Sequence, residues 1–476
     1  MILASNEINK QKVGFFRFKK IGDKFLLTNE TGDYSFLAPS QFDLFLTGKI
    51  NKAFPDKFLE LQQRNFIKNR MDLSEVSNKY ALKNYVGQGP DLHIIVVTLK
   101  CDHKCLYCQA ITEGAGNDQY DMPISIARQV VDKIFLTPND RVSIEFQGGE
   151  PLLNFDTVKF ITSYAIKKNG QANKKLSFSL VSNLTFMTKE KLEFIFKNRI
   201  QMCTSLDGPE QLHNKCRVPA KNKNSFRNAV LWFKRLQKEA DKNTGTPKPA
   251  ALTTITRFSL AYPKEIVDTY VKLGLKSIHL RPLSPFGILS KKRKSLHYTA
   301  NEFLKFYGEA LDHIISLNLN GKNISERSAT IFLKKILSDI NPGYLDTRSP
   351  CGAGIGQLAY NYNGDIYTCD EGRMLSRLGD ESFKVANVSD FSHDTLSNSQ
   401  VVKATCTASC LDSLPVCSEC VFKPYCGVCP VYNHKVNGDL FKKSDFVCQI
   451  NSGILDYLFK KITDIKIKDI FLKWLK

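Results

Sequence analysis

Three cysteines lie close together in the segment TLKCDHKCLYCQA, at Cys101, Cys105 and Cys108. Their CX3CX2C spacing brings three thiolates to one common centre and supplies no fourth ligand nearby. A structural zinc site usually has four protein ligands, whereas a 4Fe–4S cluster tolerates three and leaves one iron free. The segment therefore predicts an iron–sulfur cluster, with a zinc site as the alternative.

Other cysteines gather near the carboxyl end, in CGAGIGQLAYNYNGDIYTC and CSECVFKPYCGVC. The candidate metal ligands here are Cys351, Cys369, Cys417, Cys420, Cys426, Cys429 and Cys448. Crowded cysteines in a cytosolic chain bind metal more often than they pair as disulfides. Zinc knuckles are the alternative to iron–sulfur clusters. Cys203 and Cys216 have no partner at ligand spacing and are predicted to be ordinary thiols.

The composition agrees with a soluble, cytoplasmic protein. The chain has 476 residues, 42% of them hydrophobic, and no apolar run near the roughly 20 residues that cross a bilayer. The opening MILASNEINKQK lacks the apolar stretch of a secretory signal. The net charge of +20 comes from basic residues that are spread along the chain. Because no nucleic-acid motif accompanies them, we expect a Lys-rich surface and no nucleic-acid partner.

Strand-like and helix-like segments alternate through the middle of the chain. Strands are expected at 92–99, 142–147, 176–182, 200–206, 250–258 and 277–282, and helices at 124–136, 155–168, 188–197, 226–240 and 263–274. Strands separated by helices pair in parallel through right-handed crossovers. The fold class is therefore α/β, with a partial (β/α)6 barrel whose chemistry lies at the carboxyl ends of the strands.

The pattern divides the chain into five regions. They are a small β+α module (1–85), the barrel (86–290), a helical bridge (291–345), a cysteine-rich domain (346–450) and a basic amphipathic helix (451–476). In the first region, Gly-Asp pairs at 22–23 and 32–33 mark turns between short strands. For the last helix, docking on the domain is favoured over membrane or partner binding.

The segment CDHKCLYC, together with Gly148, Gly149 and Glu150 after the second barrel strand, resembles the signature of the radical S-adenosylmethionine (SAM) superfamily. The resemblance implies that the free iron is chelated by SAM and that the Gly-Gly-Glu segment holds the SAM amino group. It also implies cofactor contacts for Tyr107, Ser182, Ser205 and Arg217, with Arg217 as a clamp for the SAM carboxylate. The alternative for the polar residues at strand ends is an ordinary loop role.

The carboxyl-terminal cysteines resemble the SPASM extension of radical SAM enzymes, which holds two auxiliary 4Fe–4S clusters. By resemblance, the first cluster takes Cys351, Cys369 and Cys429, and the second takes Cys417, Cys420, Cys426 and Cys448. The first cluster then lacks one thiolate. Either its iron is open to a substrate group, or Cys406 or Cys410 completes it. Asp370 stands where anaerobic sulfatase maturases carry a base, although it could equally cap the backbone.

Over its length the chain resembles the His-Xaa-Ser system radical SAM maturase B group. The segments that carry this resemblance include GPDLHIIVVTLKCDHKCLYCQ, IEFQGGEPLLNFD, TSLDGPEQLHN and YNYNGDIYTCDEGRML. The resemblance implies an iron–sulfur oxidoreductase that matures a ribosomally made peptide. A flavodoxin or ferredoxin would donate the electron, a 5′-deoxyadenosyl radical would abstract hydrogen, and an auxiliary cluster would accept the remaining electron, giving a net oxidation such as a crosslink.

The resemblance also suggests two partners and leaves two alternatives. A second radical SAM maturase is a possible partner, and the amino-terminal module is similar to domains that capture leader peptides by strand addition. A role in stabilising the fold is the alternative for this module. The competing activity is formylglycine formation by an anaerobic sulfatase-type maturase. The non-enzymatic alternative is a zinc-organised basic nucleic-acid-binding or scaffold protein.

Overall fold

The computed structural model describes residues 8–68, 71–84, 87–221, 224–243, 245–286 and 294–476. The domain boundaries predicted near residues 85 and 290 lie outside this described part of the chain. Within it, no helix combines the length and the apolar character that are needed to cross a lipid bilayer.

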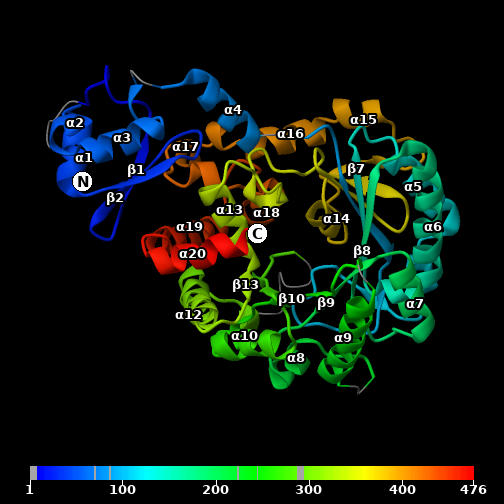
Figure 1. Ribbon diagram of the computed structural model, residues 1–476. Coiled ribbons are helices and arrows are strands. Elements are labelled where there is room, and N and C mark those ends of the chain that lie inside the picture. Colours follow the sequence, from blue (N-terminus) through cyan, green and yellow to red (C-terminus); the bar gives the residue numbers. More distant parts are fainter. Residues whose placement is uncertain (1–7, 69–70, 85–86, 222–223, 244, 287–293) are drawn as a thin grey trace.

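The chain opens with a small module of antiparallel strands and short helices (Figure 1). Its elements are β1 (Arg17–Ile21), β2 (Lys24–Thr28), β3 (Tyr34–Leu37), α1 (Pro39–Leu46), α2 (Ile50–Ala53) and α3 (Pro55–Gln63). Gly22 and Gly32 adopt φ angles of 63° and 76° at the predicted turns, a conformation that glycine accepts without a Cβ penalty. Phe25, Phe42 and Phe45 pack in a core of the module's own.

Six parallel strands form the centre of the molecule, as predicted. In sheet order they are β4 (Leu92–Thr98), β7 (Arg141–Gly148), β8 (Lys175–Ser182), β9 (Gln201–Ser205), β10 (Ala250–Thr254) and β12 (Leu280–Arg281). The helices between them are α5 (Ile124–Ile134), α6 (Phe155–Ala172), α7 (Lys189–Lys197), α8 (Glu210–Cys216), α9 (Ser225–Lys242) and α10 (Pro263–Lys272). This arrangement confirms the predicted α/β fold with a partial barrel.

The last barrel strand differs from its prediction. The expected strand at 277–282 is split, because β11 (Ser277–Ile278) pairs with β13 (Ser325–Glu326) in a separate small sheet while β12 stays in the main sheet. The Glu326 carboxylate accepts a hydrogen bond from the backbone N–H of Leu280, at 3.1 Å. This side chain therefore satisfies a backbone group at the start of β12, just after the split.

The cysteine-rich region extends the same sheet. Strands β14 (Gln357–Tyr360), β15 (Asp365–Tyr367) and β16 (Lys384–Asn387) follow one another, and β14 pairs in parallel with β4. The predicted turn at Gly364 joins β14 to β15 with a φ of 87°. The helices here are α14 (Asp370–Ser376), α15 (His393–Asn398), α16 (Gln400–Ser409), α17 (Pro415–Ser418) and α18 (Pro430–Asn437). The cysteine-rich region and the barrel thus share one sheet.

Four further helices connect the parts of the molecule. They are α4 (Leu73–Lys83), α12 (Ala300–Leu319), α13 (Arg327–Leu337) and α19 (Asp445–Lys461), and α20 (Ile465–Trp474) follows at the carboxyl end. The single helix predicted over 451–476 is wrong: Asp464 caps a new helix by accepting hydrogen bonds from the N–H groups of Lys466 and Ile467. Figure 1 shows α19 and α20 beside α12, and Trp474 is buried in the core that these helices share.

Candidate functional site

The loop after β4 carries the first cysteine group at the carboxyl edge of the barrel. Cys101 ends the short strand β5 (Lys100–Cys101), which pairs with β6 (Glu113–Gly114) and closes the loop on itself. Burial raises the pKa of the Cys101 thiol, and the neighbouring charges of Glu150, Cys105 and Cys108 raise it further. Cys101, Cys105 and Cys108 therefore lie close enough to influence one another electrostatically, as ligands of one cluster must.

A buried polar network fixes this loop. The Asp102 carboxylate lies 2.9 Å from His103 Nδ1 and accepts a hydrogen bond from Asn183 Nδ2 at 2.8 Å. His103 Nε2 in turn lies 2.9 Å from the Ser225 hydroxyl at the start of α9. A backbone N–H group of the loop also bonds to the end of α8: Leu106 donates to the carbonyl of Cys216 at 2.8 Å. The loop is thus positioned by three other parts of the barrel.

The Gly-Gly-Glu segment lies directly against the start of the cysteine loop. A Cβ atom on Gly148 would stand 2.1 Å from the Thr98 carbonyl oxygen, and one on Gly149 would stand 2.1 Å from that of Lys100. Only glycine permits this approach. The Glu150 carboxylate is fully buried and accepts hydrogen bonds from the N–H groups of Leu152 and Asn183. Burial nevertheless raises its pKa to about 7.

Tyr107, Asp207 and Arg217 form a second buried network next to the cysteines. Tyr107 Oη donates to Asp207 Oδ2 at 2.6 Å, and Arg217 Nη1 donates to Tyr107 Oη at 2.8 Å. The charge of Arg217 also lies near Cys105, where it opposes the rise in the thiol pKa that burial causes. The structure therefore places the two predicted SAM-binding residues in direct contact with each other.

The two predicted serines end neighbouring strands of the barrel. Ser182 closes β8 and donates a 2.7 Å hydrogen bond to the Glu150 carboxylate, so its hydroxyl orients a predicted SAM-binding residue. Ser205 closes β9 and is partly exposed at the same edge. Their roles toward a cofactor stay predictions.

The carboxyl-terminal cysteines separate into two groups. Cys351, Cys369 and Cys429 are within electrostatic reach of one another, and we call them the three-thiol group. Cys417, Cys420, Cys426 and Cys448 likewise influence one another, and we call them the four-thiol group. These are the two ligand sets that the resemblance implied. Among the described residues, no three His, Cys, Asp or Glu side chains are arranged to hold a single metal ion.

Cys406 and Cys410 lie on a segment that packs beside the three-thiol group, since the N–H of Cys351 donates to the Ser409 hydroxyl at 2.9 Å. Cys406 is on α16 and Cys410 follows its end, and the charge of Cys410 raises the pKa of the Cys406 thiol. The Arg348 guanidinium is the other charge that acts on Cys406. The charges that act most strongly on the three-thiol group include neither Cys406 nor Cys410.

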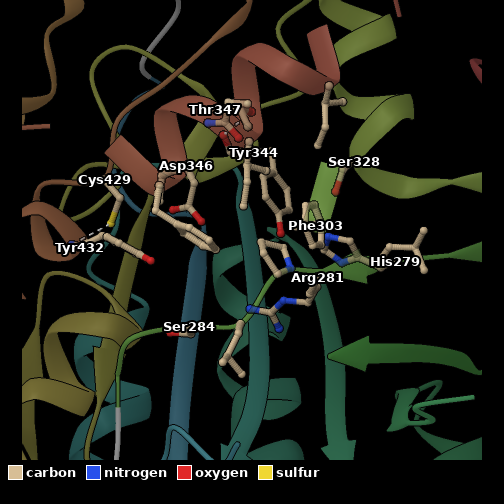
Figure 2. Close-up of a pocket in the computed structure, with 18 of the residues that line it drawn as sticks. His279, Arg281, Ser284, Phe303, Ser328, Tyr344, Asp346, Thr347, Cys429 and Tyr432 are labelled. Carbon is tan, nitrogen blue, oxygen red and sulfur yellow. Dashed lines mark hydrogen bonds between the residues drawn. The ribbon is translucent and has the colours of Figure 1, made fainter. Parts of the chain in front are cut away.

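A cavity of about 180 Å³ lies between the first cysteine loop and the three-thiol group (Figure 2). Gln109, which directly follows Cys108, lines one part, and Cys429 lines another. Its other polar lining residues include His279, Arg281, Tyr344, Asp346 and Glu371. The cavity thus lies between two predicted cluster sites.

The sequence prediction did not include the cavity carboxylates. Burial raises the pKa of Glu371 to about 7, and repulsion from Asp346 and Asp370 adds to the effect. Asp370, the predicted base, does not line the cavity; it is buried and paired with Arg373 Nε at 2.7 Å within α14. Glu371 follows Asp370 directly, so the only signal available in the sequence was adjacency to the predicted residue.

Comparison with known families matches residues 95–246 to the Radical SAM superfamily. This range starts in β4 and ends after α9, so it contains the cysteine loop, the Gly-Gly-Glu segment and Arg217.

Named relatives are similar over a longer part of the chain than residues 95–246. The chain is 23% identical over 334 residues to the cysteine-type anaerobic sulfatase-maturating enzyme of Clostridium novyi, covering 68% of this chain and 83% of that one. It is 24% identical over 361 residues to the radical SAM cyclopropyl synthase TigE of Paramaledivibacter caminithermalis, covering 72% and 69%.

Among solved structures, Streptococcus suis SuiB bound to S-adenosylmethionine has a TM-score of 0.56 at 16% identity, covering 93% of this chain and all of that chain. SuiB has also been solved bound to the precursor peptide SuiA. At this identity the likeness concerns the fold, and it includes most of the chain outside the barrel. Residues 95–246 are therefore a radical SAM domain, in a chain related to anaerobic sulfatase maturases and to a radical SAM cyclopropyl synthase.

Proposed function

We propose that this protein is a radical SAM enzyme that oxidises a peptide or small protein, and that the oxidation forms a crosslink. The observation that carries the proposal is the cavity, because it connects the residue after Cys108 with Cys429 of the three-thiol group. A substrate held there is within reach both of a site that abstracts hydrogen and of a site that accepts the remaining electron. The peptide complex of SuiA with SuiB, a protein of similar fold, supports a peptide substrate.

The donor sets fit the cofactors of this family. Cys101, Cys105 and Cys108 would hold the 4Fe–4S cluster that binds SAM, and the two carboxyl-terminal thiol groups would hold auxiliary clusters. When bound, the reduced cluster and SAM supply abstraction of a hydrogen atom from an unactivated carbon. Because Gly148 and Gly149 have no side chains, they would present backbone groups to bound SAM.

The chain's own residues prepare the site in two ways. The network of Tyr107, Asp207 and Arg217 holds a fixed positive charge beside the cysteine loop, where it can bind the SAM carboxylate. The apolar walls of the cavity, such as Phe286, Phe303 and Ile454, exclude water from the reacting carbon. The electron donor, a flavodoxin or ferredoxin, and a second maturase are part of the proposal as external partners.

The direct test is mass spectrometry of a small peptide encoded beside this protein and co-expressed with it. A crosslink or another net oxidation removes one H₂ per modified site, so we expect that mass decrease in the peptide. The same peptide co-expressed with the Cys105→Ala variant is the control and should keep its mass. Unchanged peptide mass alongside active SAM cleavage would contradict the proposed peptide oxidation.

Formylglycine formation is the second candidate, because the Clostridium novyi relative is a sulfatase-maturating enzyme. The reaction needs a base near the oxidised side chain. Asp370 is paired with Arg373 and does not line the cavity, so in this reaction the adjacent Glu371, which does line it, would be the base. A sulfatase whose active-site Cys or Ser becomes formylglycine on co-expression would decide for the second. Zinc in place of iron in anaerobically prepared protein would decide against both.

We further propose that the amino-terminal module binds the leader segment of the substrate peptide. Strand β1 is an edge of its sheet, since within the described residues it pairs only with β2. Next to this edge, Phe15 and Phe18 are 51% and 40% exposed. An edge strand flanked by exposed aromatic residues is suited to strand addition.

Replacing Phe15 by alanine is expected to weaken binding of the precursor peptide about 10-fold, because an exposed aromatic anchor is lost. Fluorescence anisotropy of the labelled peptide measures the change. Leu319→Ala is the matched control, since Leu319 is 57% exposed at the end of α12, outside this module. Equal peptide affinity in the Phe15 variant and the wild type would argue for a purely structural role of this edge.

A further inference from the structure

The three-thiol group supplies three cysteine ligands, whereas a 4Fe–4S cluster has four irons. One iron is therefore left without a cysteine ligand. The four-thiol group is complete by itself, and its members act electrostatically on one another. Cys406 lies near Arg348, and so does Cys351. The acids that act on Cys351, Cys369 and Cys429 are Asp346 and Glu371, and the strongest charges acting on these thiols include no cysteine from outside the group. A carboxylate is therefore the candidate for the fourth ligand.

Asp346 is held against this group by the backbone. The chain at Asp346 to Arg348 passes Gly427 so closely that a Cβ on Gly427 would stand 2.5 Å from the Asp346 carbonyl oxygen. Lys335 reinforces this contact, because its ammonium donates hydrogen bonds to the carbonyls of both Thr347 and Cys426. Gly427 is two residues before Cys429, so the close packing fixes Asp346 near a thiol of the group.

The side chain of Asp346 points into the cavity. It lines the cavity together with Cys429, and its surface is exposed rather than packed against neighbours. Figure 2 shows Asp346 and Cys429 on one side of the cavity, with His279 and Arg281 on the other. Asp346 is also the neighbouring acid that acts most strongly on the thiols of both Cys351 and Cys429. The carboxylate thus lies beside two of the three thiols.

This carboxylate has no partner within the part of the chain that the structure describes. It accepts no hydrogen bond and forms no ion pair there, and Arg281 acts on it only from a distance beyond an ion pair. A carboxylate that lines a cavity beside thiols, with no donor of its own, is stabilised by a nearby cation. An iron at the open corner of a cluster is a cation of the required kind.

We propose that the Asp346 carboxylate is the fourth protein ligand of an iron–sulfur cluster held by Cys351, Cys369 and Cys429. The inference rests on the auxiliary cluster of the proposed function and assigns its missing ligand. The ligand set is then three thiolates and one carboxylate. Glu371, the other carboxyl group in the cavity, stays free to face the substrate.

The test uses full-length protein in which Cys101, Cys105 and Cys108 are all replaced by alanine, so that only auxiliary clusters form on anaerobic reconstitution. A cluster iron without a protein ligand is lost on mild ferricyanide oxidation and leaves a three-iron cluster with its own EPR signal. We expect no such signal in this background and about one three-iron cluster per chain after adding Asp346→Asn. Asp346→Cys should suppress the signal again, because a thiolate replaces the carboxylate.

Glu371→Gln is the matched control, because it neutralises a second carboxyl group in the same cavity, and it should leave the spectrum unchanged. A three-iron signal already present in the background would overturn the inference and indicate an iron open to the substrate. A signal from Glu371→Gln but not from Asp346→Asn would assign the ligand to Glu371 instead. If Cys369→Ala leaves the iron content unchanged, the auxiliary cluster itself is absent, and the proposed function fails at that point.

Discussion

Replacing Cys105 by alanine should reduce reductive SAM cleavage to background, a loss of more than about 1000-fold, or about 4 kcal/mol in transition-state free energy. The variant leaves two thiols, Cys101 and Cys108, for a cluster that needs three protein ligands. Arg217 is also the neighbouring charge that acts most strongly on the Cys105 thiol. The substitution therefore removes a ligand beside the predicted SAM clamp.

The measurement is the rate of 5′-deoxyadenosine release under anaerobic, reducing conditions, together with the iron content. If all three clusters form in the wild type, the variant should lose about four of about twelve iron atoms per chain. Cys203→Ala is the matched control: Cys203 lies on β9 with no other cysteine among the charges that act on it. A Cys105 variant with wild-type iron content and wild-type SAM cleavage would refute the assignment of the first cluster.

The barrel was predictable from the sequence because its elements obey local rules. Helices α5, α6, α7, α9 and α10 each begin within about two residues of the predicted segments, since their apolar faces repeat with helical periodicity. The split of the strand at 277–282 could not be predicted in the same way. It depends on pairing with Ser325 and Glu326, more than forty residues later in the chain, and no local pattern indicates such a pairing.

The cysteine groups were predictable for a different reason. Ligand spacing within a loop, and the order of the loops along the chain, are properties of the sequence itself. The structure brings Cys429 to Cys351 and Cys369 although it lies only three residues from Cys426, which belongs to the other group. The periodicity of the surrounding segments contains no information on that division, so it could be inferred only from the family resemblance.

The cavity could not be predicted in this way. Arg281, Asp346 and Glu371 come from three separate segments, and each is an ordinary charged residue in its local sequence. The predicted base, Asp370, has the position expected in a motif, but helix α14 turns it toward Arg373, three residues on. The side chains of Asp370 and Glu371 point in different directions around α14, and those directions depend on how the helix packs.

Replacing Gly149 by alanine should disrupt the SAM site and the fold together. An alanine Cβ would stand 2.1 Å from the carbonyl oxygen of Lys100 and 2.6 Å from that of Leu99, both of them backbone atoms that cannot rotate away. Accommodation requires the segments that follow β4 and β7 to separate where Glu150 N donates to the Lys100 carbonyl at 2.7 Å. We expect a stability loss of about 2–3 kcal/mol, as for overpacked cores.

The same movement should reach the cysteine loop, because Lys100 directly precedes Cys101. SAM cleavage should therefore fall about 100-fold or more, in line with the loss on misplacing a reacting group by about 1 Å. Denaturant unfolding measures the stability, the rate of 5′-deoxyadenosine release measures SAM cleavage, and isothermal titration with SAM measures the affinity. Gly170→Ala is the matched control, since Gly170 lies in α6 with no atom within 4 Å of the added Cβ and should gain up to about 1 kcal/mol. If Gly149→Ala unfolds early but binds SAM normally, the glycine contact serves the fold alone. If both stability and SAM affinity fall, Gly149 positions the cofactor through its contact with the backbone of Leu99 and Lys100.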